Sequence, residues 1–357
     1  MNGICVTGFF SSGSSAVIDF LSEFDSTSFL NGREQYEHSL FYIGNGLFEL
    51  YDCLFSDRSN YLSRSHALND FVDLTINQYE KNYGWFGSYK KYIGKDFKSI
   101  SDDFVSNISK SQGVAVDLAD YKGVHFSLIK GILQIGAHFA YGYKISKFGR
   151  QYKKLNRPYR YLICTEKEFI SHSQRYLEQY LNVCNVNRKK HVVFDHLVTA
   201  EQIYGVRAFL TNSYRTIVLD RNPVDIYLLS KYIWDTPKHY YHPPVPLNVK
   251  DFCNNYLFQR RNIDEIKKQK NVLYIRFEDL VLNYKDTTKQ IMDFCGLKEK
   301  EHTKKKKYFN PEISQKNIGL DVIYPNESTN IKYILKSIPS DMYTYVRNKN
   351  IIRKEIF

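Results

Sequence analysis

The 357-residue chain is 43% hydrophobic and 25% charged, as in ordinary soluble globular proteins, and its formal net charge of +12 favours anionic partners. Six dispersed cysteines without a C-x-x-C pair favour free thiols over a disulfide framework. No stretch reaches the roughly 18 uncharged apolar residues that a membrane span requires. The first residues lack the charged and apolar regions of a signal peptide, so we expect a cytoplasmic protein without a transmembrane segment.

The chain begins with a pattern typical of a strand, a glycine loop and a helix. The apolar run "GICVTGF" (3–9) predicts a buried strand, and apolar residues at helical spacing predict a helix over 15–24. The segment "STSFL" (26–30) is compatible with a second strand. Between the first strand and the helix, backbone N–H groups and the positive end of the helix are expected to form an anion site.

The region from about 45 to 186 is dominated by helical patterns. We predict helices over 46–55, 67–83, 97–110, 130–146 and 168–183, and Pro158 is the only proline of the region. The region therefore reads as a helical insertion that covers the substrate.

After residue 190, strands and helices alternate. The predicted strands are 191–195, 215–220 and 271–280, and the predicted helices are 199–210, 221–232, 248–269 and 284–297. Thr199 with Gln202 suggests a capping box at the start of one helix, and Gly296 is expected to close the last one. Apolar strands separated by helices predict a parallel sheet that is covered on both faces.

The serine-rich loop "GFFSSGSS" (8–15) has the residues of a phosphate-binding loop. Gly8 and Gly13 have the G-x4-G spacing of nucleotide triphosphatases, but Ser14 replaces the lysine that follows the second glycine. Serine hydroxyls and close backbone approach suit a terminal phosphate-like group better than the phosphates and Mg²⁺ of ATP. The alternative is a purely structural glycine-rich turn.

Arg221 directly follows the predicted strand 215–220 and precedes Asn-Pro and a new helix. Ligands of open α/β sheets bind at this carboxyl edge, and Pro223 suits the first turn of a helix. A guanidinium fixed there is suited to a second phosphate. An arginine that only caps the sheet edge is the alternative.

Three segments in this order resemble the sulfotransferases that use 3′-phosphoadenosine 5′-phosphosulfate. They are the serine loop, "RNPVD" (221–225) and "VLYIRFEDLVLNYKDTTKQIMDFCGL" (272–297), with a weaker match at "YFNPEISQKNIGL" (308–320). The resemblance covers about half of the chain. It implies a P-loop-like, three-layer α/β fold with a central parallel sheet, and one domain over residues 1–357 that includes the helical insertion.

The resemblance also implies the donor-binding residues. The family's loop holds a 5′-phosphosulfate, so no lysine is needed after the second glycine, and the arginine binds the 3′-phosphate. The residues that this assigns to the donor are Gly8, Ser11, Ser12, Gly13, Ser14, Ser15, Arg221, Ser230, Lys316 and Asn317.

The sequence departs from the family pattern at two positions that bind the phosphosulfate donor in the family. Most members carry Lys or Arg at the position of Ser11, where it stabilises charge on the leaving phosphate; here Arg33, Lys316 or Arg276 is the substitute, or transfer is slow or absent. The family's 3′-phosphate serine aligns with Leu229, and Ser230 lies one residue later, which rotates the side chain by about 100° on a helix.

The candidate general bases are Glu34, His196 and His38. Glu34 lies in "NGREQYEH", where some members carry a basic or glycine-rich element with a glutamate, and Arg33 is the neighbouring cation. The base removes the acceptor proton as oxygen attacks sulfur in line, while loop N–H groups and cations stabilise the leaving nucleotide. A purely hydrogen-bonding role is the alternative for each of them.

The sequence therefore predicts transfer of a sulfuryl group to a hydroxyl, on a carbohydrate of a bacterial surface glycan. The bacterial origin is suggested by the excess of Lys, Asn, Ile and Tyr, which is typical of an AT-rich genome. The alternatives are a P-loop small-molecule kinase and a catalytically inactive nucleotide- or glycan-binding relative. We expect no metal, because no His/Cys/Asp cluster has ligand spacing, and no nucleic acid, because Lys304–Lys307 reads as a solvated surface.

Overall fold

The computed structural model describes residues 1–30, 41–77, 95–113, 158–234, 246–339 and 343. These residues form two compact units. One unit falls within Met1–Tyr42 and Leu177–Phe357, and the other within Ile43–Lys81 and Gly94–Tyr176. The assignment of the whole chain to one domain with an insertion over about 45–186 stays a prediction.

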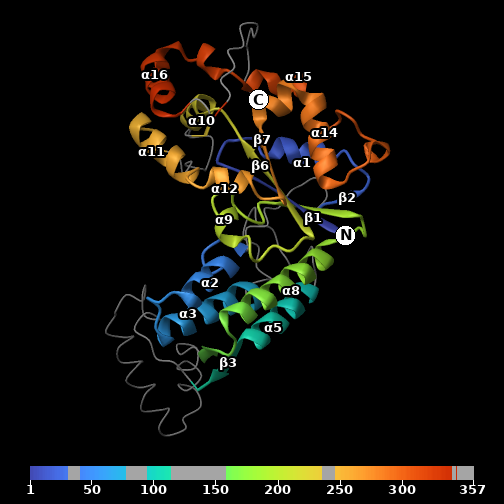
Figure 1. Ribbon diagram of the computed structural model, residues 1–357, viewed down its shortest axis with the longest axis vertical. Coiled ribbons are helices and arrows are strands. Elements are labelled where there is room, and N and C mark those ends of the chain that lie inside the picture. Colours follow the sequence, from blue (N-terminus) through green and yellow to red (C-terminus); the bar gives the residue numbers. More distant parts are fainter. Residues whose placement is uncertain (31–40, 78–94, 114–157, 235–245, 340–342, 344–357) are drawn as a thin grey trace, which may run out of the picture. The chain divides into compact units, whose positions relative to one another are not determined.

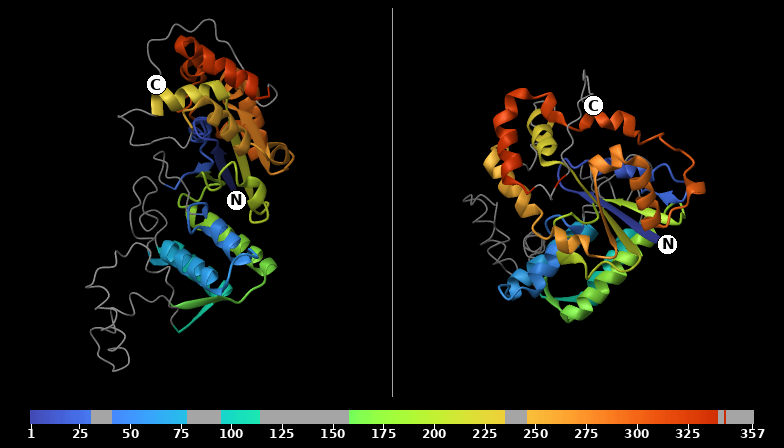
Figure 2. Two further views of the ribbon diagram at one scale, coloured as in Figure 1. Left: turned by 90° about the vertical axis from the view of Figure 1, so that its left-hand side faces the viewer. Right: turned by 45° about the horizontal axis from the view of Figure 1, so that its top comes forward.

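The first unit is built on a five-stranded sheet in which all strands are parallel (Figure 1). The strand order is β2-β5-β1-β6-β7, and Figure 2 shows the strands from two further directions. The strands are β1 (Asn2–Gly8), β2 (Thr27–Ser28), β5 (His191–Asp195), β6 (Tyr214–Asp220) and β7 (Val272–Arg276). This confirms the predicted α/β class with a central parallel sheet.

Helices precede, separate and follow the strands of this sheet along the chain (Figure 1). They are α1 (Ser15–Leu21), α8 (Glu166–Cys184), α9 (Ile203–Val206), α10 (Pro223–Leu229), α11 (Val249–Gln259), α12 (Ile263–Lys267), α13 (Phe277–Leu282), α14 (Tyr284–Cys295), α15 (Pro311–Ser314) and α16 (Ser328–Ser337). A π-helix, η5 (Ser230–Trp234), extends α10, and short 3-10 turns are η6 (Glu299–Glu301), η7 (Gln315–Asn317), η8 (Leu320–Val322) and η9 (Pro325–Glu327). The division between the two units falls within α8.

The sheet is buried on both faces, which explains its continuous apolar strands. On one face, alternate residues of β1, β6 and β7 share a buried core with α1, α13 and α14. On the other face, Phe194 of β5 stacks on Tyr180 of α8 with ring centroids 5.8 Å apart, and the hydroxyl of Tyr214 donates to the carbonyl of Leu177. The strands and these helices therefore form one layered core.

Two local signals act as predicted. Pro223 occupies the first helical position of α10, as predicted. Asn222, expected within the helix, caps it instead, since its Oδ1 accepts the backbone N–H of Val224 at 2.9 Å. Gly296 closes α14 in the left-handed conformation with φ 69°. These residues mark where α10 begins and where α14 ends.

Several predicted boundaries are wrong. The helix expected over 199–210 exists only as α9. The predicted capping box does not form there, since Thr199 Oγ1 donates to the side-chain oxygen of Gln202 at 3.0 Å. The strand expected over 271–280 ends at Arg276, where α13 begins. Apolar periodicity alone marked neither boundary.

The helix expected over 248–269 is divided into α11 and α12. The break falls at Arg260, whose guanidinium lies between the rings of Phe9 and Tyr256, at 3.8 and 3.5 Å from their centroids. The same guanidinium pairs with Asp220 at the end of β6. The break therefore coincides with a residue whose side chain is held by Phe9, Tyr256 and Asp220.

The second unit contains α2 (Leu47–Phe55), α3 (Tyr61–Val72), the π-helix η2 (Asp73–Asn77), α5 (Lys95–Ile108) and the first part of α8. Their core is aromatic: Phe104 stacks on Tyr176 with ring centroids 4.8 Å apart, and the two hydroxyl oxygens of Ser101 and Tyr176 lie 2.7 Å apart. The helix predicted over 97–110 ends at Ile108, and β3 (Ser109–Gln112) pairs antiparallel with β4 (Tyr159–Leu162). The helix predicted over 130–146 lies outside the described residues.

Candidate functional site

The loop between β1 and α1 depends on both of its glycines. A side chain on Gly8 would place Cβ 2.7 Å from the carbonyl oxygen of Leu219, and one on Gly13 would place it 2.9 Å from the ring of Phe277. Gly13 has φ 86° and Ser11 has φ 60°, both in the left-handed region. The loop therefore packs closely against the end of β6 and the start of α13.

The serine hydroxyls of this loop are suited to a ligand. The side-chain oxygens of Ser11 and Ser12 are buried, and neither has a hydrogen-bond partner among the described residues. Ser12 is only 1% exposed. Because a buried hydroxyl without a partner costs about 1–3 kcal/mol, an anion that accepts from the Ser11 hydroxyl would be stabilised there. The hydroxyl of Ser12 lies against Gly8, and Ser12 is not among the residues that line the cavity described below.

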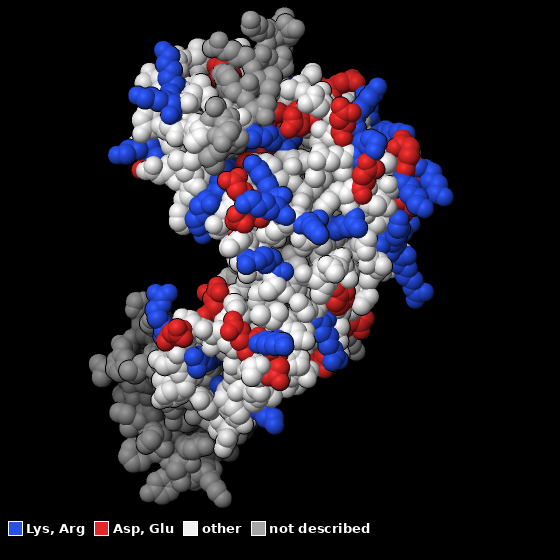
Figure 3. Space-filling model, in the orientation of Figure 1, with Lys and Arg blue, Asp and Glu red and all other residues white. Residues whose placement is uncertain are grey.

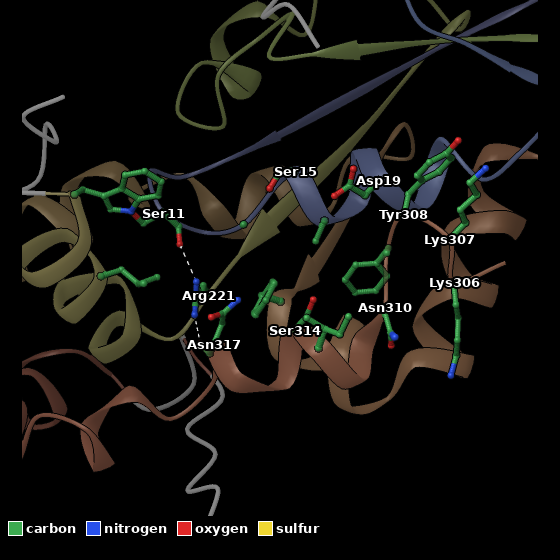
Figure 4. Close-up of a pocket in the computed structure, with 17 residues that line it drawn as sticks. Ser11, Ser15, Asp19, Arg221, Lys306, Lys307, Tyr308, Asn310, Ser314 and Asn317 are labelled. Atoms are coloured by element: carbon green, nitrogen blue, oxygen red, sulfur yellow. Dashed lines mark hydrogen bonds between the residues drawn. The ribbon is translucent and has the colours of Figure 1, made fainter. Parts of the chain in front are cut away.

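Arg221 lies buried at the end of β6, directly beside this loop (Figure 4). Its Nη1 donates to the carbonyl of Ser11 at 3.4 Å, its Nη2 donates to the carbonyl of Asn317, and its guanidinium lies 4.6 Å from the centroid of the Phe277 ring. Its Nε and the Oδ1 of Asn317 are buried without hydrogen-bond partners among the described residues. Two unsatisfied polar groups thus lie where segments 9–14 and 315–317 meet.

Two buried carboxyl groups support this arginine. Asp225 accepts the backbone N–H groups of Gly319 at 3.0 Å and Leu320 at 2.7 Å, which ties the segment after Asn317 to α10. Glu278 accepts the backbone N–H of Asn222 at 2.9 Å. Burial raises the pKa of Asp225 and raises that of Glu278 to about 7, and burial lowers the pKa of the arginine.

A separate network fixes the end of β6. The carboxylate of Asp220 accepts two hydrogen bonds from Arg260, at 2.9 and 2.5 Å, one from Tyr274 at 2.6 Å and one from the backbone N–H of Arg221 at 2.8 Å. Because Arg260 also stacks on Phe9, it connects the strand end to the serine loop. Each carboxylate oxygen of Asp220 therefore already accepts two hydrogen bonds, which leaves it poorly suited to bind a metal ion.

These elements surround a cavity of about 380 Å³. In Figure 4, Ser11, Arg221 and Asn317 lie together, and Ser15 and Asp19 lie between this group and Tyr308, Lys307 and Lys306. The lining residues are Ser11, Gly13, Ser15, Ala16, Asp19, Arg221, Leu229, Trp234, Phe277, Lys306, Lys307, Tyr308, Phe309, Asn310, Ile313, Ser314 and Asn317.

The structure brings five of the predicted donor residues to this cavity: Ser11, Gly13, Ser15, Arg221 and Asn317. Of the other predicted donor residues, Gly8, Ser12 and Ser14 belong to the same loop, and Lys316 precedes Asn317. Ser230 is fully buried and its hydroxyl donates to the carbonyl of Ile226 at 2.7 Å, while Leu229 lines the cavity. The binding roles of all these residues stay predictions.

The predicted catalytic residues are only partly described. Glu34, Arg33 and His38 lie outside the described residues. His196 follows β5 with φ 53°, and its Nδ1 lies 2.7 Å from Asp195 Oδ1. It does not line the cavity, and neither does Arg276 or Lys316, the proposed substitutes for the loop cation.

The sequence missed the wall formed by residues 306–310. Lys306 and Lys307 belong to a run that we interpreted as solvated surface, yet both line the cavity. Figure 3 shows basic side chains gathered over α14 and the chain that follows it, with acidic side chains among them. The run of lysines can be read from the sequence. Its position near the end of α1 cannot, because it depends on contacts between residues far apart in the sequence, such as Glu23 with Lys306.

Within the described ranges, no three His, Cys, Asp or Glu side chains are grouped as a metal site would require. The helices described here include none with the length and apolar character to span a membrane.

Residues 159–317, which include Arg221, Asn317, β5, β6 and β7, match the family model described as the sulfotransferase domain. The serine loop lies before the matched range. No curated protein matches the chain. The domain match supports a place among the sulfotransferases and, in general terms, sulfuryl transfer as the reaction.

Proposed function

We propose that this chain transfers a sulfuryl group from 3′-phosphoadenosine 5′-phosphosulfate to a hydroxyl of a carbohydrate. The observation that carries the proposal is the meeting of the serine loop with a buried arginine in one cavity, each with polar atoms that lack a partner among the described residues. Two such groups suit a ligand with two separate anionic groups.

The residues present fit this donor. The hydroxyl of Ser11 would bind the phosphosulfate, and Nε of Arg221 would bind the 3′-phosphate. Asn317 could contribute only through its Nδ2, because its Oδ1 is an acceptor. A guanidinium is suited to the 3′-phosphate because it offers several donors in one plane and keeps its charge when it is buried. When bound, the donor supplies an electrophilic sulfur and a nucleotide leaving group.

The protein's own contribution to the chemistry is orientation and charge stabilisation. The serine loop and Arg221 hold the anionic groups in fixed positions, so little reorganisation is needed during transfer. We propose Glu34 or His196 as the base that takes the acceptor proton, with Arg33 nearby as a cation. His196 would keep a defined ring orientation through its contact with Asp195.

A kinase is the less favoured function. Gly13 is followed by Ser14 where kinases with this loop carry lysine. Asp220, the carboxylate at the end of β6, is hydrogen-bonded to Arg260 and Tyr274. We further propose a bacterial, cytoplasmic enzyme that acts on a surface glycan. This acceptor and location are supported by the sequence resemblance and the composition alone.

The test is calorimetric binding of 3′-phosphoadenosine 5′-phosphate and of ADP. We expect the bisphosphate to bind more tightly than ADP, and Arg221→Ala to weaken its binding about 10- to 100-fold and remove the difference, since a hydrogen-bonded charge is lost. The control is Arg261→Ala, which removes an exposed arginine that stacks on Phe258. Equal binding of both nucleotides by the wild type, or an unchanged preference in Arg221→Ala, would overturn the 3′-phosphate assignment.

A further inference from the structure

Glu23 lies two residues after α1, and its side chain is fully buried. One carboxylate oxygen accepts the backbone N–H groups of Tyr308 and Phe309, both at 3.0 Å. The other accepts the backbone N–H of Lys306 at 3.1 Å and lies 2.7 Å from Nε2 of His302. All four contacts of this carboxylate therefore come from residues 302–309.

Residues 306–310 form one wall of the cavity, which we call the 306–310 wall. Lys306 has φ 56°, and a left-handed backbone costs about 1 kcal/mol or more at a residue with a side chain. Its N–H bond to Glu23 stabilises this conformation. The wall is thus held in its shape by a carboxylate that does not itself line the cavity.

Neighbouring contacts attach the same segment to the end of α1. The backbone N–H of Lys304 donates to the carbonyl of Glu23 at 3.2 Å, and that of Asp25 donates to the carbonyl of Glu301 at 2.9 Å. The rings of Phe24 and His302 stack with centroids 4.4 Å apart. Since α1 begins at the serine loop, one helix connects that loop to the opposite wall of the cavity.

We infer that Glu23 is a positioning residue for nucleotide binding, which acts by fixing the 306–310 wall. The inference rests on the proposed function. The wall belongs to the part of the cavity farther from Arg221 and Asn317 (Figure 4), so we expect Glu23 to affect the binding of both 3′-phosphoadenosine 5′-phosphate and ADP. The contacts given above for its carboxylate include neither Arg221 nor Asn317, the residues proposed for the 3′-phosphate that ADP lacks.

The experiment is calorimetric binding of both nucleotides to Glu23→Gln. The amide keeps the volume but replaces one acceptor oxygen with a donor, which opposes the N–H of Lys306. We expect the affinity for both nucleotides to fall about tenfold, a change of about 1.4 kcal/mol in each, with an unchanged ratio between them. Arg221→Ala, in contrast, is expected to change that ratio.

Two controls separate positioning from a general loss of stability. Asp25→Asn changes a nearby carboxylate that lies 3.7 Å from the ammonium of Lys304. Cys295→Ala weakens the buried core at the end of α14. Both are expected to keep wild-type affinity at temperatures where they remain folded. If Glu23→Gln does not fold, His302→Phe keeps the ring stack and removes one donor, and a smaller loss of affinity for both nucleotides is expected.

The outcomes distinguish this inference from the proposed function. Wild-type binding of 3′-phosphoadenosine 5′-phosphate with unchanged affinity in the Glu23 and His302 variants overturns the positioning role alone. A loss of affinity in Cys295→Ala equal to that in Glu23→Gln also overturns it, because general destabilisation would then explain the effect. Failure of the wild type to bind either nucleotide overturns the proposed function and this inference together.

Discussion

Glu278 and Asp225 are the two carboxyl groups whose charges act on the buried guanidinium of Arg221. Glu278 is 1% exposed, and its second oxygen has no hydrogen-bond partner among the described residues. Burial raises its pKa from 4.5 to about 7, so its charge changes near neutral pH. The charge balance around the proposed 3′-phosphate site therefore depends on pH.

We predict that Glu278→Gln changes how stability depends on pH. Because the folded pKa is above the unfolded one, this carboxyl contributes stability that is fully present below pH 4.5 and is lost as the pH rises through 7. Between pH 5 and 8.5, the wild type should lose on the order of 2 kcal/mol of unfolding free energy more than the variant does. Denaturant unfolding of both proteins at the two pH values measures this difference, and parallel losses would contradict it.

Single elements show what the sequence makes predictable. The apolar run of β6 and the left-handed cap at Gly296 are local signals, and both appear in the structure as predicted. The serine loop and Arg221 were also recognisable, because short motifs carry them. The break at Arg260 and the 306–310 wall were not, because each depends on a partner distant in sequence, Asp220 for the arginine and Glu23 for the wall.

The pair of Arg260 and Asp220 is the element-level contact that we expect to be most costly to break. Both side chains are nearly inaccessible, at 1% and 2%, so removal of one leaves the other charge buried without its partner. Arg260→Met should destabilise the protein by about 3–5 kcal/mol, and it should also release Phe9 from its stacking contact.

The double variant Asp220→Asn/Arg260→Met tests whether the uncompensated charge of Asp220 causes this loss of stability. Because the double variant leaves no uncompensated charge, it should recover part of the stability lost in Arg260→Met. Denaturant unfolding of the wild type, both single variants and the double variant gives the coupling between the two side chains. Additive losses would show that the pair is not what holds the end of β6 to the α11–α12 break.

At the level of the entire chain, the net charge of +12 overstates how much free positive charge the lysine run presents. Lys304, Lys305 and Lys306 are paired with Asp25, Glu299 and Glu312. Such pairs at the surface are screened by water and salt, so they do little for stability. Global stability at acid pH should depend more on titratable groups that are buried without partners.

His191 is such a group. It begins β5 between β2 and β1, is fully buried, and neither of its ring nitrogens has a hydrogen-bond partner among the described residues. Burial, aided by the charge of Lys190, lowers its pKa from 6.5 to about 4, so its contribution to stability is present above pH 6.5 and is lost as the pH falls through 4. Between pH 7 and 4 the wild type should lose on the order of 3 kcal/mol more than His191→Phe, in which nothing at this position takes up a proton. Denaturant unfolding at the two pH values measures this difference. Equal losses of unfolding free energy in the two proteins would show that another group causes the loss of stability at acid pH.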